Sequence, residues 1–172
     1  MQELKFAMTP GLYRDDACMD RVYSWEELCE KGVVKLSEGK LSGTSTVEED
    51  SIIDGVLVLP RNVENICNYA FTSEPKLRGL VSHEIIKSIG VSAFAGCKNL
   101  EFVDIRCENI CENAFMRCTS LKKLSDKAGN IIIGNSAFGW CSTLEKLTLT
   151  EGAKVHPGAL LGCEQLYHVE YV

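Results

Sequence analysis

The sequence predicts an α/β fold: a solenoid of short parallel strands and short helical turns, behind a mixed N-terminal cap. Three observations predict it. An Ala-Phe pair recurs every 21 to 23 residues, aliphatic residues return at fixed positions around each pair, and residues 1–55 lack the pattern. One such unit cannot bury its own apolar face, but stacked units merge their apolar faces into one core.

The repeated frame can be written I-x3-A-F-x2-C-x2-L-x2-V-x-I, and five copies occupy residues 56–172. The anchors are Ala70-Phe71, Ala93-Phe94, Ala114-Phe115, Ala137-Phe138 and Ala159-Leu160. Leucine stands seven residues after every anchor alanine. Cysteine stands four residues after it in four copies, as Cys97, Cys118, Cys141 and Cys163, and Glu74 takes its place in the first.

Each copy should contain one strand and one tight helical turn. Leucine followed by aliphatic residues three and five positions later gives a strand whose alternate side chains point inward. In residues 101–106 we therefore expect Val103 and Ile105 to point into the core, and Phe102, Asp104 and Arg106 to point outward. The alanine of each anchor lets the backbone turn in, and the following Phe or Leu fills the coil.

Two copies depart from the frame in their strands. Ser82 and Asp126 stand where other copies have an inward aliphatic residue or Tyr171. We expect these two strands to end early or to bulge, with irregular loops after them.

Residues 1–55 should form the cap that a solenoid needs at its end. Ser24 and Glu27 have the spacing of a capping box, which predicts a helix from about 25 to 31 that stops at Gly32. A short strand over 33–36, a turn over 37–40 and a polar loop over 42–50 should follow.

The frame resembles the BspA-type leucine-rich repeat, which has the same Ala-Phe-x2-Cys-x2-Leu pattern. Val56-Leu-Val-Leu-Pro60, followed by Val63 and Ile66, resembles that family's entry into a repeat. The resemblance implies a right-handed leucine-rich-repeat solenoid with a parallel sheet on its concave side. It also implies a binding role, since members are commonly adhesins or surface interaction proteins.

Composition and charge exclude several classes of function. The formal net charge of −6 argues against nucleic-acid binding, which needs clustered Lys and Arg. No run of 18 apolar residues exists, so no membrane insertion is expected. The N-terminus lacks the apolar run of a secretory signal, which predicts a cytoplasmic protein, or a cell-surface or secreted one if the sequence is part of a longer chain.

We expect no enzyme, no metal and no cofactor. The nine cysteines match no zinc spacing, and the repeated ones should be buried free thiols that pack as small apolar groups. Metal or redox use of these thiols is the alternative. His83 should lie in a loop, His156 at a corner and His168 at an outward strand position, and no phosphate loop or nucleophile elbow is present.

The outward strand positions remain as a candidate surface for a protein partner. The expected function is a protein–protein interaction module that presents a concave face. The candidate residues on this face are Phe102, Asp104, Lys123, Lys146, Thr148, Tyr167 and His168. The alternative is a structural or self-assembling element, a homo-oligomer that pairs through an open C-terminal edge, since the strand that ends at Tyr171 has no expected neighbour.

Overall fold

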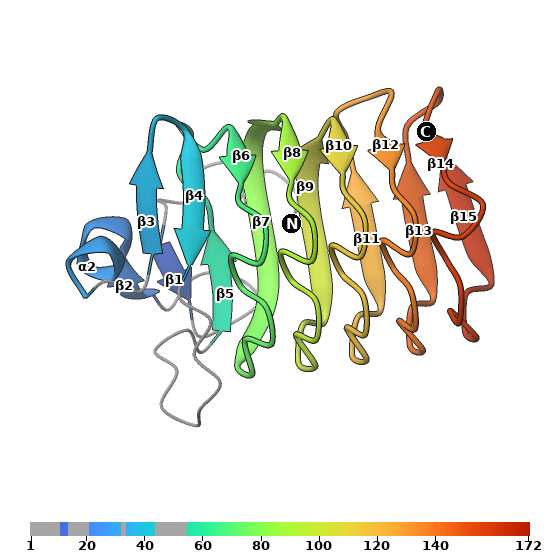
Figure 1. The fold of residues 1–172 in the computed structure, drawn as a ribbon, viewed down its shortest axis with the longest axis horizontal. Helices are drawn as coiled ribbons and strands as arrows, with labels where there is room; N and C mark the ends of the chain where they lie inside the picture. The colour runs from blue at the N-terminus through green and yellow to red at the C-terminus, as the bar shows by residue number, and fades with distance from the viewer. Residues whose placement is uncertain (1–10, 14–20, 32–33, 44–54) are drawn as a thin grey trace.

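The chain folds as a solenoid in which two sheets of parallel strands enclose one apolar core (Figure 1). The computed structural model describes residues 11–13, 21–31, 34–43 and 55–172. Each coil contributes one strand to each sheet, so that strands equivalent in the repeat lie side by side. This arrangement confirms the predicted solenoid.

The larger sheet has eight strands in the order β15-β13-β11-β9-β7-β5-β1-β2. Its last six strands in the chain run parallel. They are β5 (Gly55–Val58), β7 (Leu77–Ile86), β9 (Phe102–Cys107), β11 (Lys123–Asp126), β13 (Lys146–Leu149) and β15 (His168–Tyr171). At the N-terminal end, β1 (Gly11–Tyr13) pairs antiparallel with both β5 and β2 (Arg21–Ser24).

The smaller sheet has seven strands in the order β14-β12-β10-β8-β6-β4-β3. Its parallel strands are β4 (Lys40–Gly43), β6 (Asn65–Ile66), β8 (Ser88–Ile89), β10 (Asn109–Ile110), β12 (Ile132–Ile133) and β14 (Lys154–Val155). The first strand, β3 (Val34–Ser37), forms an antiparallel hairpin with β4. These short strands contain the β-branched residue that precedes each anchor.

The Ala-Phe segments are successive hydrogen-bonded turns and not helices, so the α part of the predicted class is smaller than expected. The residue three positions after each anchor alanine has a positive φ. In the first four copies, the residue directly before the alanine also has a positive φ. Left-handed residues interrupt an α-helix. They are Tyr69, Ser73, Ser92, Gly96, Asn113, Arg117, Ser136, Trp140 and Gly162.

Four phenylalanines stack through the middle of the coils. The ring centroids of Phe71, Phe94, Phe115 and Phe138 are 5.2, 5.2 and 5.4 Å apart, with interplanar angles of 9° or less. All four side chains are fully buried. Equivalent positions of the repeat therefore meet as a ladder, as the frame predicts.

The repeated cysteines form a second ladder beside the phenylalanines. Each Sγ donates to the carbonyl oxygen of the phenylalanine in the preceding coil, at 3.0 or 3.1 Å. All eight described cysteines are free thiols, as expected; among the repeated ones Cys97, Cys118 and Cys141 are buried, whereas Cys163 is half-buried. Cysteine at this position is thus both a small apolar group and a donor to a buried carbonyl.

The cap contains the only helix among the described residues, α2 (Trp25–Glu30). Its capping box is present: Glu27 N donates to Ser24 Oγ, and Ser24 N donates to the Glu27 carboxylate at 2.6 Å. Trp25 and Leu28 are buried in the core. The helix therefore closes the apolar interior at this end, one residue shorter than expected, with Lys31 as C-cap.

The expected strand and turn of the cap are also present. The strand begins at Val34, and the turn places Glu38 and Gly39 in the left-handed region before β4. Residues 32 and 33, which include the expected stop Gly32, lie outside the described part, as do residues 44–50 of the expected polar loop.

The strand that contains Ser82 is bulged as expected, whereas the strand that contains Asp126 keeps its register. The register of β7 with β9 shifts between Val81 and Ile85, which confirms a bulge beside Ser82. Asp126 lies within β11, opposite Ile105, and is completely buried. Its carboxylate accepts from the amides of Cys107 and Ala128, at 3.0 and 3.2 Å, and these bonds allow a charged group inside.

Two expectations about exposed positions are wrong. Phe102 points away from the main core, yet only 7% of its surface is exposed. It belongs to a second apolar cluster with Val56, Val58 and Val81. His83 lies in β7 and not in a loop, because the bulged strand continues to Ile86.

Candidate functional site

The candidate surface is the outer face of the eight-stranded sheet, on the side away from the main core. Backbone pairing places Lys123, Lys146 and His168 beside one another on neighbouring strands, with Phe102 next in line on β9. We call Lys123, Lys146 and His168 the basic row. All three side chains are exposed. Four of the seven candidate residues therefore lie on one line across the strands.

A second line runs parallel to the basic row, two residues further along each strand. It consists of Asp104, Ser125, Thr148 and Glu170, which pair in that order from β9 to β15. We call these four residues the hydroxyl row, since Ser125 and Thr148 form its middle. Asp104 and Thr148, both candidates from the sequence, are thus brought into this row.

Ion pairs connect charged residues on this face. Lys146 Nζ lies 2.7 Å from Glu170 Oε2, and this contact lowers the pKa of the Glu170 carboxyl. Lys127 Nζ lies 2.9 Å from Asp104 Oδ1. The carboxylates of Asp104 and Glu170 are therefore each ion-paired with a lysine.

Lys123 has a different environment. Its Nζ lies 5.8 Å from the ring centroid of Phe102, a cation–π contact. Among the described residues, no carboxylate lies within ion-pair distance of Lys123, although its side chain is exposed. The ammonium group of Lys123 is therefore open to an anion from outside.

Tyr167 is an exposed aromatic residue among the seven candidates. It precedes β15, and 77% of its surface is accessible. Its amide donates to the carbonyl of Glu145 on the neighbouring coil, so the backbone holds its position. An exposed aromatic residue on a fixed backbone suits a contact with another protein.

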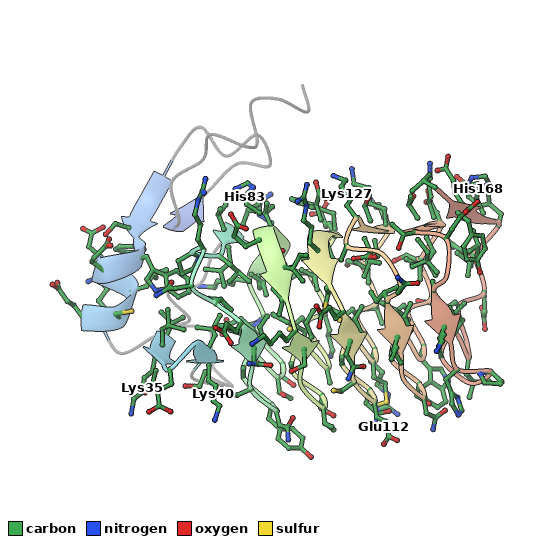
Figure 2. The ribbon with its side chains drawn as sticks, turned by 90° about the horizontal axis from the view of Figure 1, so that it is seen from above. Lys35, Lys40, His83, Glu112, Lys127 and His168 are labelled. Atoms are coloured by element: carbon green, nitrogen blue, oxygen red, sulfur yellow. The ribbon has the colours of Figure 1, made fainter. Side chains whose placement is uncertain are left out.

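Figure 2 labels His83, Lys127 and His168 along one side of the molecule, that of the larger sheet. Further charged groups lie near the carboxyl ends of β5 and β7. Arg61 and Glu84 form an ion pair at 3.4 Å. Burial, followed by the charge of Arg61, lowers the pKa of His83, so the imidazole stays neutral near pH 7. This edge borders the outer face at β7 and β9.

Lys127 and Glu170 were not among the candidate residues predicted from the sequence. Glu170 occupies the same position in its copy as Asp104, so the repeat alone could have selected it. Lys127 follows Asp126, which departs from the frame, and no pattern in the sequence indicates its ion pair with Asp104.

Several thiols of the solenoid have raised pKa values. Burial raises the pKa of Cys97 and of Cys107 to about 12 and that of Cys163 to about 11, so these thiols remain protonated. The described part contains no group of three His, Cys, Asp or Glu side chains that could hold a metal ion. Within the same residues, no helix has the length and apolar character of a membrane span.

Solved structures share this fold. A leucine rich cell surface protein from Faecalibacterium prausnitzii matches with 28% identity and a TM-score of 0.62, over 69% of this chain and 32% of that one. A leucine rich repeat protein of T. pallidum matches with 23% identity and a TM-score of 0.63, over 79% of this chain and 66% of that one.

The pneumococcal vaccine antigen PcpA matches with 20% identity and a TM-score of 0.58, over 82% of this chain and 37% of that one. The match covers between 32% and 66% of the length of these proteins. None of the curated proteins matches the sequence significantly.

The model of the BspA type leucine rich repeat region matches residues 55–170 in six copies. The larger sheet has six parallel strands over the same residues, from β5 to β15, and five Ala-Phe or Ala-Leu anchors lie between them. The match covers well over half of the sequence. The chain therefore belongs to the BspA-type leucine-rich repeat family.

Proposed function

We propose that this chain is a non-catalytic protein–protein interaction module whose binding surface is the outer face of the eight-stranded sheet. The observation that carries the proposal is the register of the exposed basic row, Lys123, Lys146 and His168, beside the hydroxyl row. Hydrogen-bonded strands hold neighbouring members of each row about 4.8 Å apart. A partner therefore meets side chains whose relative positions are fixed before it binds.

The composition of this face supports a protein partner. One row holds the basic residues, the other holds two hydroxyl groups between two carboxylates, and Tyr167 adds an exposed aromatic ring. Such mixed polar groups around a few aromatic residues are typical of non-obligate protein interfaces. The buried thiols with raised pKa values do not offer a nucleophile at neutral pH.

Site-specific photocross-linking tests which face is used. A photoreactive benzoylphenylalanine is placed either at Ser125, in the hydroxyl row, or at Lys154, an exposed residue of β14 in the opposite sheet. We expect a defined cross-linked protein from Ser125 and none from Lys154. Cross-linking from Lys154 alone would contradict the proposal.

A second candidate function is self-assembly through the C-terminal edge. Val169 and Tyr171 on β15 are 39% and 56% exposed, whereas their equivalents on β13, Leu147 and Leu149, are fully buried. Covering these side chains would extend the core by one coil. Light scattering of a Tyr171→Lys variant tests this: a dimer that becomes a monomer supports it, and a monomeric wild-type chain contradicts it.

The cellular location of the protein can be tested in its source cells. Eight free thiols favour a reducing compartment, which agrees with the expected cytoplasmic location. The 28% identical relative is described as a cell surface protein, which supports the other location. Protease treatment of intact source cells separates the two, because only a surface chain is cleaved.

A further inference from the structure

Over strands β9 to β15, the outer face of the eight-stranded sheet carries more cations than anions, although the whole chain is acidic. Its outward positions on β9 to β15, together with Lys127, hold four cations and two anions, while the formal net charge of the chain is −6. The cations are Arg106, Lys123, Lys127 and Lys146, and the anions are Asp104 and Glu170. The local field therefore favours a partner that carries negative charge.

The basic row offers its cations unequally. Lys123 is exposed and lies over the Phe102 ring, with no carboxylate of the described residues within ion-pair distance, whereas Lys146 is paired with Glu170 at 2.7 Å. An incoming carboxylate would meet Lys123 without displacing a competitor. At Lys146 it would share the ammonium group with Glu170, so Lys123 should contribute more to binding.

The arrangement favours a polypeptide over a densely charged polymer. Asp104 and Glu170 stand at the two ends of the hydroxyl row and already pair with Lys127 and Lys146, so the described part of this face does not offer the run of unpaired cations that a sulfated glycan or a nucleic acid requires. Ser125 and Thr148 between them can hydrogen-bond to peptide groups, and Tyr167 can pack against an apolar side chain. A peptide with spaced carboxylates matches this mixture.

We propose that the outer face binds an extended acidic segment of a partner protein, which crosses the strands with a carboxylate on Lys123 and another near Lys146 or His168. The distance from β11 to β15 is about 10 Å, which three residues of an extended chain span. This inference rests on the function proposed above and adds the chemistry of the partner.

Fluorescence polarisation with labelled model peptides tests it. The first peptide alternates glutamate with alanine over about eight residues, and the controls carry glutamine or lysine instead of glutamate. We expect the glutamate peptide to bind best, and about tenfold less tightly when salt rises from about 50 to about 200 mM. Lys123→Gln should weaken its binding about three- to tenfold, and Lys146→Gln less.

Lys154→Gln is the matched control, because it removes an exposed lysine from the opposite sheet. It should leave both the affinity and the melting temperature unchanged. Equal binding of the glutamate and glutamine peptides would overturn the inference, and so would equal losses from Lys123→Gln and Lys154→Gln. Tighter binding of a heparin fragment than of the glutamate peptide would overturn the choice of a polypeptide.

The two proposals fail in different ways. Cross-linking from Ser125 together with no preference for glutamate would support the proposed binding face and contradict only the proposed acidic partner. Glutamate binding that depends on Lys154 and not on Lys123 would contradict the binding face itself.

Discussion

The ring of Phe102 lies directly against Gly79, its paired residue on the preceding strand of the larger sheet. A Cβ atom at position 79 would stand only 2.6 Å from Phe102 Cε1. The φ of Gly79 is outside the left-handed region, so space and not backbone geometry requires glycine here. The missing side chain lets an outward-pointing phenylalanine become buried.

Gly79→Ala should therefore displace the ring of Phe102. We expect an increase in exposed apolar surface and a loss of about 1–2 kcal/mol in the free energy of unfolding, as for other overpacked sites. Urea denaturation measures the loss. Thr148→Ala, on the same face but without a ring above it, is the control, and an equal loss there would contradict the account.

Phe102→Ala should cost about 2–3 kcal/mol, less than the about 3–5 kcal/mol expected for Phe115→Ala. Phe102 belongs to a cluster of four residues, whereas Phe115 stacks between Phe94 and Phe138 in the main core. Denaturation of both variants under one set of conditions compares them. A negligible cost for Phe102→Ala would show that its ring is not buried in solution.

Asp126→Ala should cost about 2–3 kcal/mol, because the buried amide of Cys107 and the half-buried amide of Ala128 would lose their acceptor. Burial also raises the pKa of the Asp126 carboxyl, so the folded chain tolerates a neutral group there. Asp126→Asn keeps an acceptor oxygen and should cost less at pH 7. Equal costs for the two variants would show that these hydrogen bonds contribute little.

The buried thiols predict a loss of stability in alkali. In the folded chain the pKa of Cys97 and of Cys107 is about 12, against an ordinary value of 9.0, so the folded state holds the proton more tightly. Their contribution to the free energy of unfolding is complete below pH 9 and is lost between pH 9 and about pH 12. At pH 10 each thiol should lower the free energy of unfolding by about 1.4 kcal/mol relative to pH 7.

Denaturation of Cys97→Ala at pH 7 and pH 10 measures this effect for one thiol. The variant should be less stable than the wild type at pH 7, yet lose less stability between the two pH values. Cys29→Ala is the control, since that cysteine is exposed. An equal pH dependence in wild type and Cys97→Ala would contradict the raised pKa.

The sequence was sufficient for the ladder architecture and for the cap helix. Residues at equal positions of the frame must meet when coils stack, so Phe71 to Phe138 could be placed in one core before any coordinates. The capping box of Ser24 and Glu27 is a local interaction within four residues, which a local pattern can predict.

The sequence was insufficient where the outcome depends on neighbours across strands. Burial of Phe102 requires Gly79 beside it, and the pairing of these two residues follows from a register that includes a bulge. The left-handed turns at ordinary residues such as Asn113 and Trp140 also follow from stacking, since no glycine marks them. Lys127 became a site residue only through its ion pair with Asp104.

The most direct test of the central claim is the affinity of the protein that cross-links from Ser125, measured for Thr148→Trp and for Lys154→Trp. Thr148 lies in the hydroxyl row of the outer face, and Lys154 lies in the opposite sheet. We predict a loss of at least about tenfold for Thr148→Trp, with an unchanged melting temperature, and wild-type affinity for Lys154→Trp. Wild-type affinity for Thr148→Trp together with a loss for Lys154→Trp would contradict the claim that the outer face of the larger sheet is the binding surface.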